Sequence, residues 1–253
     1  MIRVFTTWYE EPKAERRAEF LACLNDNLNN EYVGQVCVIA EKLDSSPSSS
    51  TKLDLKHATT RPTYEDFRAW INDIVSEDDV SIIANTDIYF DETVRFADQA
   101  LDANECYALA RWENGALTDR NDSQDAWMFR GKMRPMDADY RLGVPRCDNR
   151  FLRELREAGY TVKNPSFAIR ANHVHAGEVR HYDVITSDAW VDPPYGYAWP
   201  QNLLSLPETL WYNARHPMRR VPWRFDLRAT PLSLPGRVVH RIRREFTSRA
   251  RSA

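Results

Sequence analysis

A short apolar run that ends beside a carboxylate is the feature that most constrains this chain. Val80 to Ala84 lies between polar residues 76–79 and the sequence Asn85-Thr86-Asp87, a pattern typical of a central strand that is covered on both faces. In open α/β sheets, ligands bind beyond the carboxyl ends of such strands. An Asn-x-Asp sequence there can hold a hard cation and, through it, a diphosphate. Asp87 is therefore the first candidate binding residue, although short Asp motifs after strands also brace turns.

Strand and helix patterns alternate before this strand. Strand-like segments are expected at residues 2–8 and 35–40, with an amphipathic helix at 14–28 between them. A second helix is expected after Pro62, with Thr63 as its cap. This order of strand, helix and strand favours a parallel sheet. The side chains expected to face inward are Ala14, Ala18, Leu21, Leu24 and Leu28 in the first helix and Phe67, Trp70, Ile71 and Ile74 in the second.

The second half of the chain has a different pattern. Strand-like segments at 105–112 and 125–130 are joined by about a dozen residues, which are too few for a crossover helix. The sheet is therefore expected to be mixed. A helix at 148–158 and short strands at 160–162 and 167–171 are expected to follow.

Proline and aromatic residues dominate from Trp190 onward, which is typical of irregular structure. We therefore expect one α/β domain at 1–189 and an extension at 190–253 that wraps over it and ends in a basic tail.

The charge of this extension is strongly asymmetric. From Arg215 onward, eleven arginines are opposed only by Asp226 and Glu245, so this segment carries +9 in a chain whose net charge is −3. A basic tail on an acidic body suggests an anionic partner, either a membrane surface or a nucleic acid. Residues 236–251 have the pattern of a helix that lies on an anionic membrane, and a solvated basic terminus has the same composition.

The cysteines and the hydropathy suggest a reduced, cytoplasmic protein. The four cysteines are scattered and form no Cys-x-x-Cys pair, which argues against a structural zinc site and a disulfide framework. No apolar run approaches the roughly 18 residues needed to cross a bilayer. The first nine residues resemble a strand and not a signal peptide.

Three later clusters also carry candidate side chains. In His173-Val174-His175 the two imidazoles would point to the same side of a strand, where one or both could ligate a metal. Asp148 stands at a helix start, where it could cap the helix or act as a base. Asp125 could offer hydrogen bonds, while Trp127 is more typical of a core residue.

In this order the motifs resemble the GT-A fold of nucleotide-sugar glycosyltransferases. The resemblance covers about residues 2–175 and is strongest with small bacterial glycosyltransferase-like proteins of surface-polysaccharide pathways. It implies a GT-A-like, Rossmann-type mixed sheet flanked by helices. The residues that carry it are the strand–helix–strand start, Asn85-Thr86-Asp87, Ser123-Gln124-Asp125-Ala126-Trp127, the segment from Gly143 to Asn149, and His173-Val174-His175.

The resemblance also implies a role for each motif. Asp87 matches the second acid of the family's Asp-x-Asp motif, which binds Mn²⁺ or Mg²⁺ and the donor diphosphate, and Asn85 stands where the first acid usually stands. His175, or else His173, matches a late histidine that completes the metal shell. Asp148 matches the general base of inverting members. The remaining matches are Thr6, Thr7 and Tyr9 near the nucleotide, and Asp125, Trp127 and Asn149 on the acceptor side.

The sequence thus predicts a metal-assisted, hexosyltransferase-like enzyme, cytoplasmic and peripheral at the inner face of the plasma membrane. It would move a sugar from a UDP- or GDP-type donor to a glycan or lipid-linked acceptor. Two alternatives stay open: a metal-dependent phosphoester hydrolase that uses Asp87 with His173 and His175, and, less favoured, a nucleic-acid-binding protein that acts through the arginine tail. Removal of Asp87 is expected to leave the fold intact, because a ligand at a strand end carries little of the core.

Overall fold

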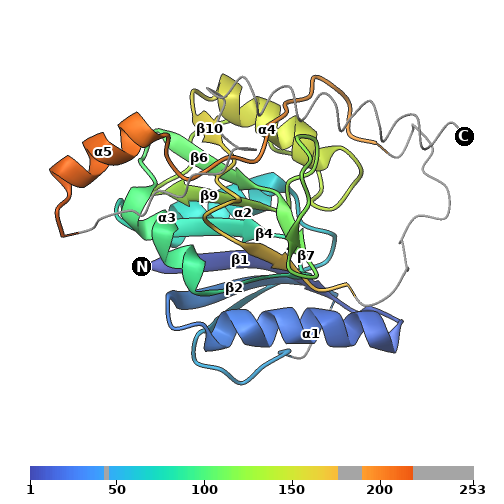
Figure 1. Ribbon diagram of the computed structural model, residues 1–253. Coiled ribbons are helices and arrows are strands. Elements are labelled where there is room, and N and C mark those ends of the chain that lie inside the picture. The colour runs from blue at the N-terminus through green and yellow to red at the C-terminus, as the bar shows by residue number, and fades with distance from the viewer. Residues whose placement is uncertain (43–45, 176–189, 219–253) are drawn as a thin grey trace, which may run out of the picture.

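A seven-stranded mixed sheet forms the centre of the computed structural model, which describes residues 1–42, 46–175 and 190–218 (Figure 1). The spatial order is β10 (Thr161–Lys163), β6 (Glu105–Leu109), β9 (Ala126–Arg130), β4 (Val80–Ala84), β1 (Ile2–Tyr9), β2 (Val33–Glu41) and β3 (Leu53–Ala58). The strands β4, β1, β2 and β3 are parallel to one another, β10 is parallel to β6, and β9 runs antiparallel to both of its neighbours, β4 and β6. The mixed α/β sheet flanked by helices that the sequence predicts is confirmed.

Alternation along the strands divides the core into two layers. On β4, Ile82 and Ala84 face one cluster of buried side chains while Ile83 faces the other, and β9 divides its residues in the same way. Successive side chains of a strand point to opposite faces, so both faces of this sheet must be covered. The first cluster packs against α1 (Ala14–Asn29) and α3 (Arg95–Ala100), and the second against α2 (Tyr64–Ile74) and α4 (Cys147–Glu157).

A small second sheet lies beside the main one. Its order is β5 (Ile88–Phe90), β11 (Ala171–His173), β7 (Arg111–Glu113) and β8 (Ala116–Leu117). β11 pairs antiparallel with β5 and parallel with β7. This pairing brings the chain around His173 next to the segments that follow β4 and β6, although these segments are far apart in sequence.

Local signals explain the helices that the sequence predicts well. α2 begins after Thr63, whose hydroxyl accepts from the Asp66 backbone N–H while the Asp66 carboxylate accepts from the Thr63 N–H. This is the predicted capping box. The C-terminal end of α4 passes into Gly159, whose φ of 87° suits a glycine stop.

The inward face of α1 differs from the predicted one. Ala14, Ala18 and Leu21 are exposed, and the buried face begins at Arg16 and Glu19 instead. It is made of Arg16, Glu19, Phe20, Cys23, Leu24, Asn27 and Leu28. The prediction used apolar residues alone. It therefore chose the wrong inward face, because the buried face of α1 includes two charged side chains and one amide.

Other differences concern short or covered elements. The predicted strand at 167–171 is wrong, since the strand there is β11, and the predicted strand at 105–112 is two strands in different sheets. The strand β3 and the helix α5 (Leu206–Arg215) were not predicted. α5 has a clear start signal, because Ser205 and Glu208 form a capping box.

The described part of the extension runs across α4 before it reaches α5. The backbone N–H of Val191 donates to the Pro145 carbonyl, and that of Gly196 donates to the Asn149 carbonyl. The predicted membrane helix at 236–251 lies outside the described residues. Among the described helices, none is long and apolar enough to cross a membrane.

We predict that Asn27 holds β5 against α1. Its side-chain amide donates to the Ile88 carbonyl at 2.9 Å and accepts from the Phe90 N–H at 3.0 Å, and all of these groups are buried. Asn27→Ala leaves two buried backbone groups unpaired, so urea denaturation should show a loss of about 2–4 kcal/mol. Asn25→Ala, at an exposed position of the same helix, is the control and should cost less than about 1 kcal/mol. Equal losses in the two variants would contradict this role.

Candidate active site

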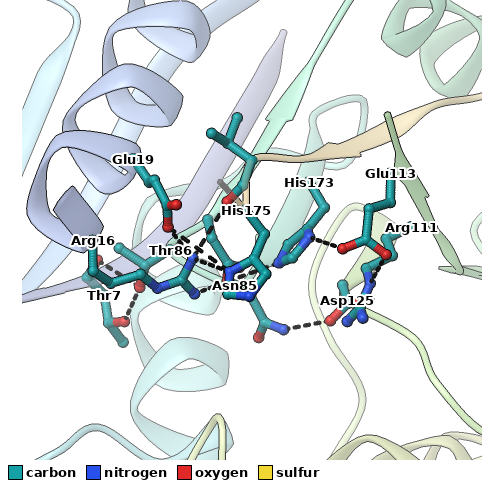
Figure 2. A network of polar contacts seen from close by, with 12 residues as sticks. Thr7, Arg16, Glu19, Asn85, Thr86, Arg111, Glu113, Asp125, His173 and His175 are labelled. Atoms are coloured by element: carbon teal, nitrogen blue, oxygen red, sulfur yellow. Dashed lines mark hydrogen bonds and ion pairs between the residues drawn. The ribbon is translucent and has the colours of Figure 1, made fainter. Parts of the chain in front are cut away.

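Polar side chains gather at one edge of the main sheet. The carboxyl ends of β1 and β4 meet there, and because β9 is antiparallel, its first residue, Ala126, pairs with Ala84 at the same edge. Thr7 near the end of β1 and Thr86 after β4 join their hydroxyls at 2.7 Å (Figure 2). The edge is thus where an α/β sheet places ligands.

Asp87 is held between two cationic side chains. The Arg16 guanidinium pairs with its Oδ2, and Nε2 of His173 lies 3.1 Å from the same oxygen. Burial raises the pKa of Asp87, but the hydrogen bond and charge of His173 and the charge of Arg16 outweigh it and lower the pKa to about 2. Asp87 is therefore ionised. It connects the loop after β4 to α1 through Arg16 and to β11 through His173.

His173 lies between two carboxylates (Figure 2). Its Nε2 faces Asp87 and its Nδ1 lies 3.4 Å from Oε1 of Glu113. Burial lowers the pKa of His173, but Asp87 outweighs burial and raises the pKa above its usual value. With acceptors facing both nitrogens, the imidazolium form is favoured.

His175 joins the same network from the other side. Its ring is stacked on that of His173 with centroids 5.4 Å apart, and its Nδ1 accepts from Arg16 at 3.2 Å. Arg16 also pairs with Glu19 at 2.5 Å. The two histidines therefore point to the same side, as expected, but the structure brings His173 and not His175 to Asp87.

Asp125 lies next to this network and is deeply buried. Its Oδ1 accepts from the Asn85 amide at 2.8 Å, and its Oδ2 lies 3.8 Å from Arg111 Nη1. Burial raises the pKa of Asp125, Arg111 opposes the rise, and the charge of Asp87 adds to it. This carboxyl is electrostatically coupled to Asp87 on one side and to Asp148 on the other.

Asp148 is a carboxyl whose pKa is raised toward neutrality. Burial, followed by the charge of Asp125, raises the pKa of Asp148 to about 6, although backbone N–H groups oppose the rise. Its Oδ2 accepts from the Gln124 N–H at 3.3 Å. Asp148 is not the cap of α4, since the N-cap is Arg146 and Asp148 lies in the first turn.

Arg146 shows a backbone feature that often accompanies a functional site. It is a non-glycine residue with φ of 70° at the start of α4, a conformation that costs of order 1 kcal/mol or more. Its guanidinium lies over the rings of Trp190 and Tyr195, 5.2 Å and 5.7 Å from their centroids. The structure thus places a cation two residues before Asp148, and the rings of Trp190 and Tyr195 lie against this cation.

Some predicted residues lie inside the protein. Trp127 and Asn149 are 0% and 1% exposed, so neither offers a surface that an acceptor could contact. Trp127 packs edge-on against Tyr64 and Phe151 in the core, and Asn149 bonds the carbonyl of Gly196. Thr6 is also buried, while Tyr9 is half-buried and packs edge-on against Phe20.

The residues that sequence reasoning missed are the charged partners. Arg16 and Glu19 come from the buried face of α1, and Arg111 and Glu113 come from β7. The sequence contained one signal for Arg16 and Glu19: they are spaced so that they share a helix face with Phe20, Cys23 and Asn27. No local pattern indicates which carboxylate a buried arginine will meet.

The predicted metal ligands do not form a metal site in this arrangement. Within the described ranges, no group of three His, Cys, Asp or Glu side chains is arranged to hold a metal ion. Asp87 Oδ2 is shared by Arg16 and His173, both nitrogens of His173 face carboxylates, and Nδ1 of His175 accepts from Arg16. Arg16 and His173 thus provide the positive charge that a divalent ion would bring to Asp87.

The chain is similar in structure to parts of several solved proteins. These are a mannosyltransferase from Pyrobaculum calidifontis, solved with GDP-Man and Mn²⁺ (14% identity, 72% of this chain, TM-score 0.46), TarS of S. aureus, solved with UDP (12%, 51%, 0.38), and a 4-diphosphocytidyl-2C-methyl-D-erythritol synthase (15%, 51%, 0.34). The matches span 58%, 46% and 74% of those chains. No protein-family model and no curated protein sequence matches the chain. At these identities and TM-scores, a function has to be argued from the site itself.

We predict that removal of Asp87 destabilises the fold, contrary to the expectation from the sequence. Asp87→Ala leaves the guanidinium of Arg16 and the His173 ring inside the protein without their shared carboxylate. Breaking a buried ion pair from one side typically costs about 3–5 kcal/mol, which denaturant unfolding would measure. Glu92→Ala, an exposed acid from the same region, is the control and should cost about 0.5 kcal/mol or less.

A double-mutant cycle separates this ion pair from general damage. Combining Asp87→Ala with Arg16→Ala should cost less than the sum of the two single changes, because each single change strands the partner's charge. Additive losses would show that the pair is not coupled.

Proposed function

We propose that this protein is a glycosyltransferase that moves a sugar from a nucleotide-sugar donor to a hydroxyl of a glycan or lipid-linked acceptor. The observation that carries the proposal is Asp148, a carboxyl of raised pKa at the carboxyl edge of a mixed α/β sheet, coupled to Asp125 and beside Arg146. Enzymes tune carboxyl pKa values upward by burial and by neighbouring carboxylates, and such groups mark sites of acid–base chemistry.

In this proposal Asp148 is the general base. Its carboxylate takes the proton from the acceptor hydroxyl as that oxygen forms a bond to the anomeric carbon of the donor. The bond from this carbon to the diphosphate oxygen breaks, and its electron pair leaves with the nucleoside diphosphate. A base with a pKa near 6 is ionised at neutral pH and is a stronger proton acceptor than an ordinary aspartate.

Arginine and histidine side chains lie at this edge, each beside a carboxylate. Arg16 and His173 pair with Asp87, and Arg111 lies near Asp125, so these side chains form an ordered polar network and carry no excess of positive charge. Because Asp87 is already paired, no step of the mechanism is assigned to Mn²⁺ or Mg²⁺. The polysaccharide pathway, the hexosyl specificity and the position at the inner membrane face belong to the same proposal.

A donor screen tests the proposal directly. Purified protein is mixed with GDP-mannose, UDP-glucose, UDP-galactose or UDP-N-acetylglucosamine, with and without Mn²⁺, and its melting temperature is measured, since a ligand that binds the native state raises it. At least one donor should raise the melting temperature and release its nucleoside diphosphate when sugar acceptors are added. Release of phosphate from p-nitrophenyl phosphate without any donor effect would favour the hydrolase, and steeply salt-dependent binding of RNA or DNA alone would favour the nucleic-acid protein.

We predict that Asp148→Asn yields a stable protein with little transferase activity. The amide oxygen can still accept from Gln124, and loss of a buried charge beside Asp125 removes repulsion, so the melting temperature should stay constant or rise. General-base assistance contributes about 10²- to 10⁴-fold in rate, and kcat for the identified donor should fall by that factor. Asp139→Asn, an exposed aspartate before α4, is the control. Near-normal kcat in Asp148→Asn would show that Asp148 is not the general base, and Asp125 would be the next residue to test.

A second prediction concerns pH. The base must be ionised, and burial with the charge of Asp125 sets the pKa of Asp148 near 6. The value of kcat/KM should therefore fall about tenfold per pH unit below about pH 6 and level off above it. This profile is measured with wild-type protein over a range in which its fluorescence stays native. A plateau that extends down to pH 4.5 would contradict a base with this pKa.

A further inference from the structure

The helix α5 presents its apolar side chains to solvent. Leu210 and Trp211 are 62% and 64% exposed, and Leu206 is 46% exposed. Pro207 and Ala214 are exposed as well. A surface helix normally turns its apolar stripe toward the core, so α5 is reversed in this respect.

The exposed residues form a single stripe. At 100° per residue, Leu206, Leu210, Ala214, Pro207 and Trp211 fall on one continuous arc. The side that faces the protein carries Thr209, which is buried, and Tyr212, which packs against the core. Ser205 and Glu208 cap the helix and Pro207 lies in its first turn, so the helix is well defined without any partner on the apolar side.

The helix lies at the periphery of the molecule (Figure 1, orange). It is anchored near one end of the sheet, where Glu208 lies 3.6 Å from Lys163 of β10. α1 lies on the opposite side of the sheet in the same view. The apolar stripe thus lies at the end of the sheet near β10.

The chain that follows α5 is strongly cationic. Residues 219–253 contain ten arginines and no lysine, against Asp226 and Glu245 only. Arg215, in the last turn of α5, places its guanidinium 4.6 Å from the Trp211 ring. An apolar stripe with a tryptophan, continued directly by dense positive charge, matches the requirements of a surface formed by apolar chains beneath anionic headgroups.

We propose that the apolar stripe of α5 is a docking surface for an anionic lipid bilayer. Leu206, Leu210 and Trp211 enter the boundary between headgroups and acyl chains, and Arg215 contacts the headgroups. The interaction combines buried apolar area with electrostatic attraction. This inference names the surface that would hold the protein at the membrane in the proposed function, and vesicle binding tests it separately from transferase activity.

Vesicle binding by the full chain tests the proposal. Wild-type protein is sedimented with vesicles of 70% phosphatidylcholine and 30% phosphatidylglycerol, and with pure phosphatidylcholine. It should bind the anionic vesicles well and the neutral ones weakly. The double variant Leu210→Ser with Trp211→Ser should lose at least about tenfold in its affinity for the anionic vesicles, because it removes most of the apolar contact.

Leu21→Ser is the matched control. Leu21 is also an exposed leucine, 39% exposed, but lies on α1, so this variant should bind like wild type. Circular dichroism and melting temperature verify that all variants are folded. Unchanged binding by the double variant, or no binding of wild type to anionic vesicles, would overturn the proposal.

Oligomeric state and melting temperature identify any other occupant of the stripe. Amides of residues 206–215 should gain further protection from hydrogen exchange when anionic vesicles are added, but not when neutral ones are added. If the double variant converts a wild-type dimer into a monomer without vesicles, the stripe is an interface between copies. If the double variant of a monomer loses several degrees of melting temperature without vesicles, the chain itself covers the stripe; either result overturns lipid docking.

Discussion

The ion pair between Asp87 and Arg16 is the contact on which the arrangement of this site depends. Asp87 follows the central strand β4, Arg16 comes from α1, and His173 comes from the second sheet. Three segments with no neighbouring positions in the sequence thus meet at one carboxylate oxygen. Because such a group is costly to leave unpaired once it is buried, the packing of α1 against the sheet and the position of β11 are linked to the same interaction.

The architecture was predictable where one periodicity dominates. The apolar run of β4, the capping box at Thr63 and the glycine after α4 are local signals, and each element formed where it was expected. The face of α1 was not predictable in this way, because its inner side includes Arg16, whose partner Asp87 lies more than seventy positions away. Apolar periodicity describes burial against a core and contains no information about buried ion pairs.

The candidate site shows the same division. The position of Asn85 and Asp87 at a strand end followed from the sheet, and Thr7 and Asp125 were predicted from the resemblance; the roles of all four stay predictions. The interactions that set their chemistry were not found, since they depend on distances between side chains of different elements. In α5 the apolar pattern misleads in the other direction. Its apolar stripe has the pattern of a buried helix face, but the structure shows that this stripe is exposed.

Asn85 connects these observations. An amide at this position donates to Asp125 at 2.8 Å, whereas an acid would place a further negative charge between Asp87 and Asp125. The pKa of Asp125 is already raised by burial and by Asp87, and Asp125 in turn raises the pKa of Asp148. Like charges in a buried cluster force protonation of some members. The amide therefore adds no negative charge beside Asp87, which His173 and Arg16 keep ionised against its burial. Burial, followed by the charge of Asp125, then raises the pKa of Asp148 toward neutrality.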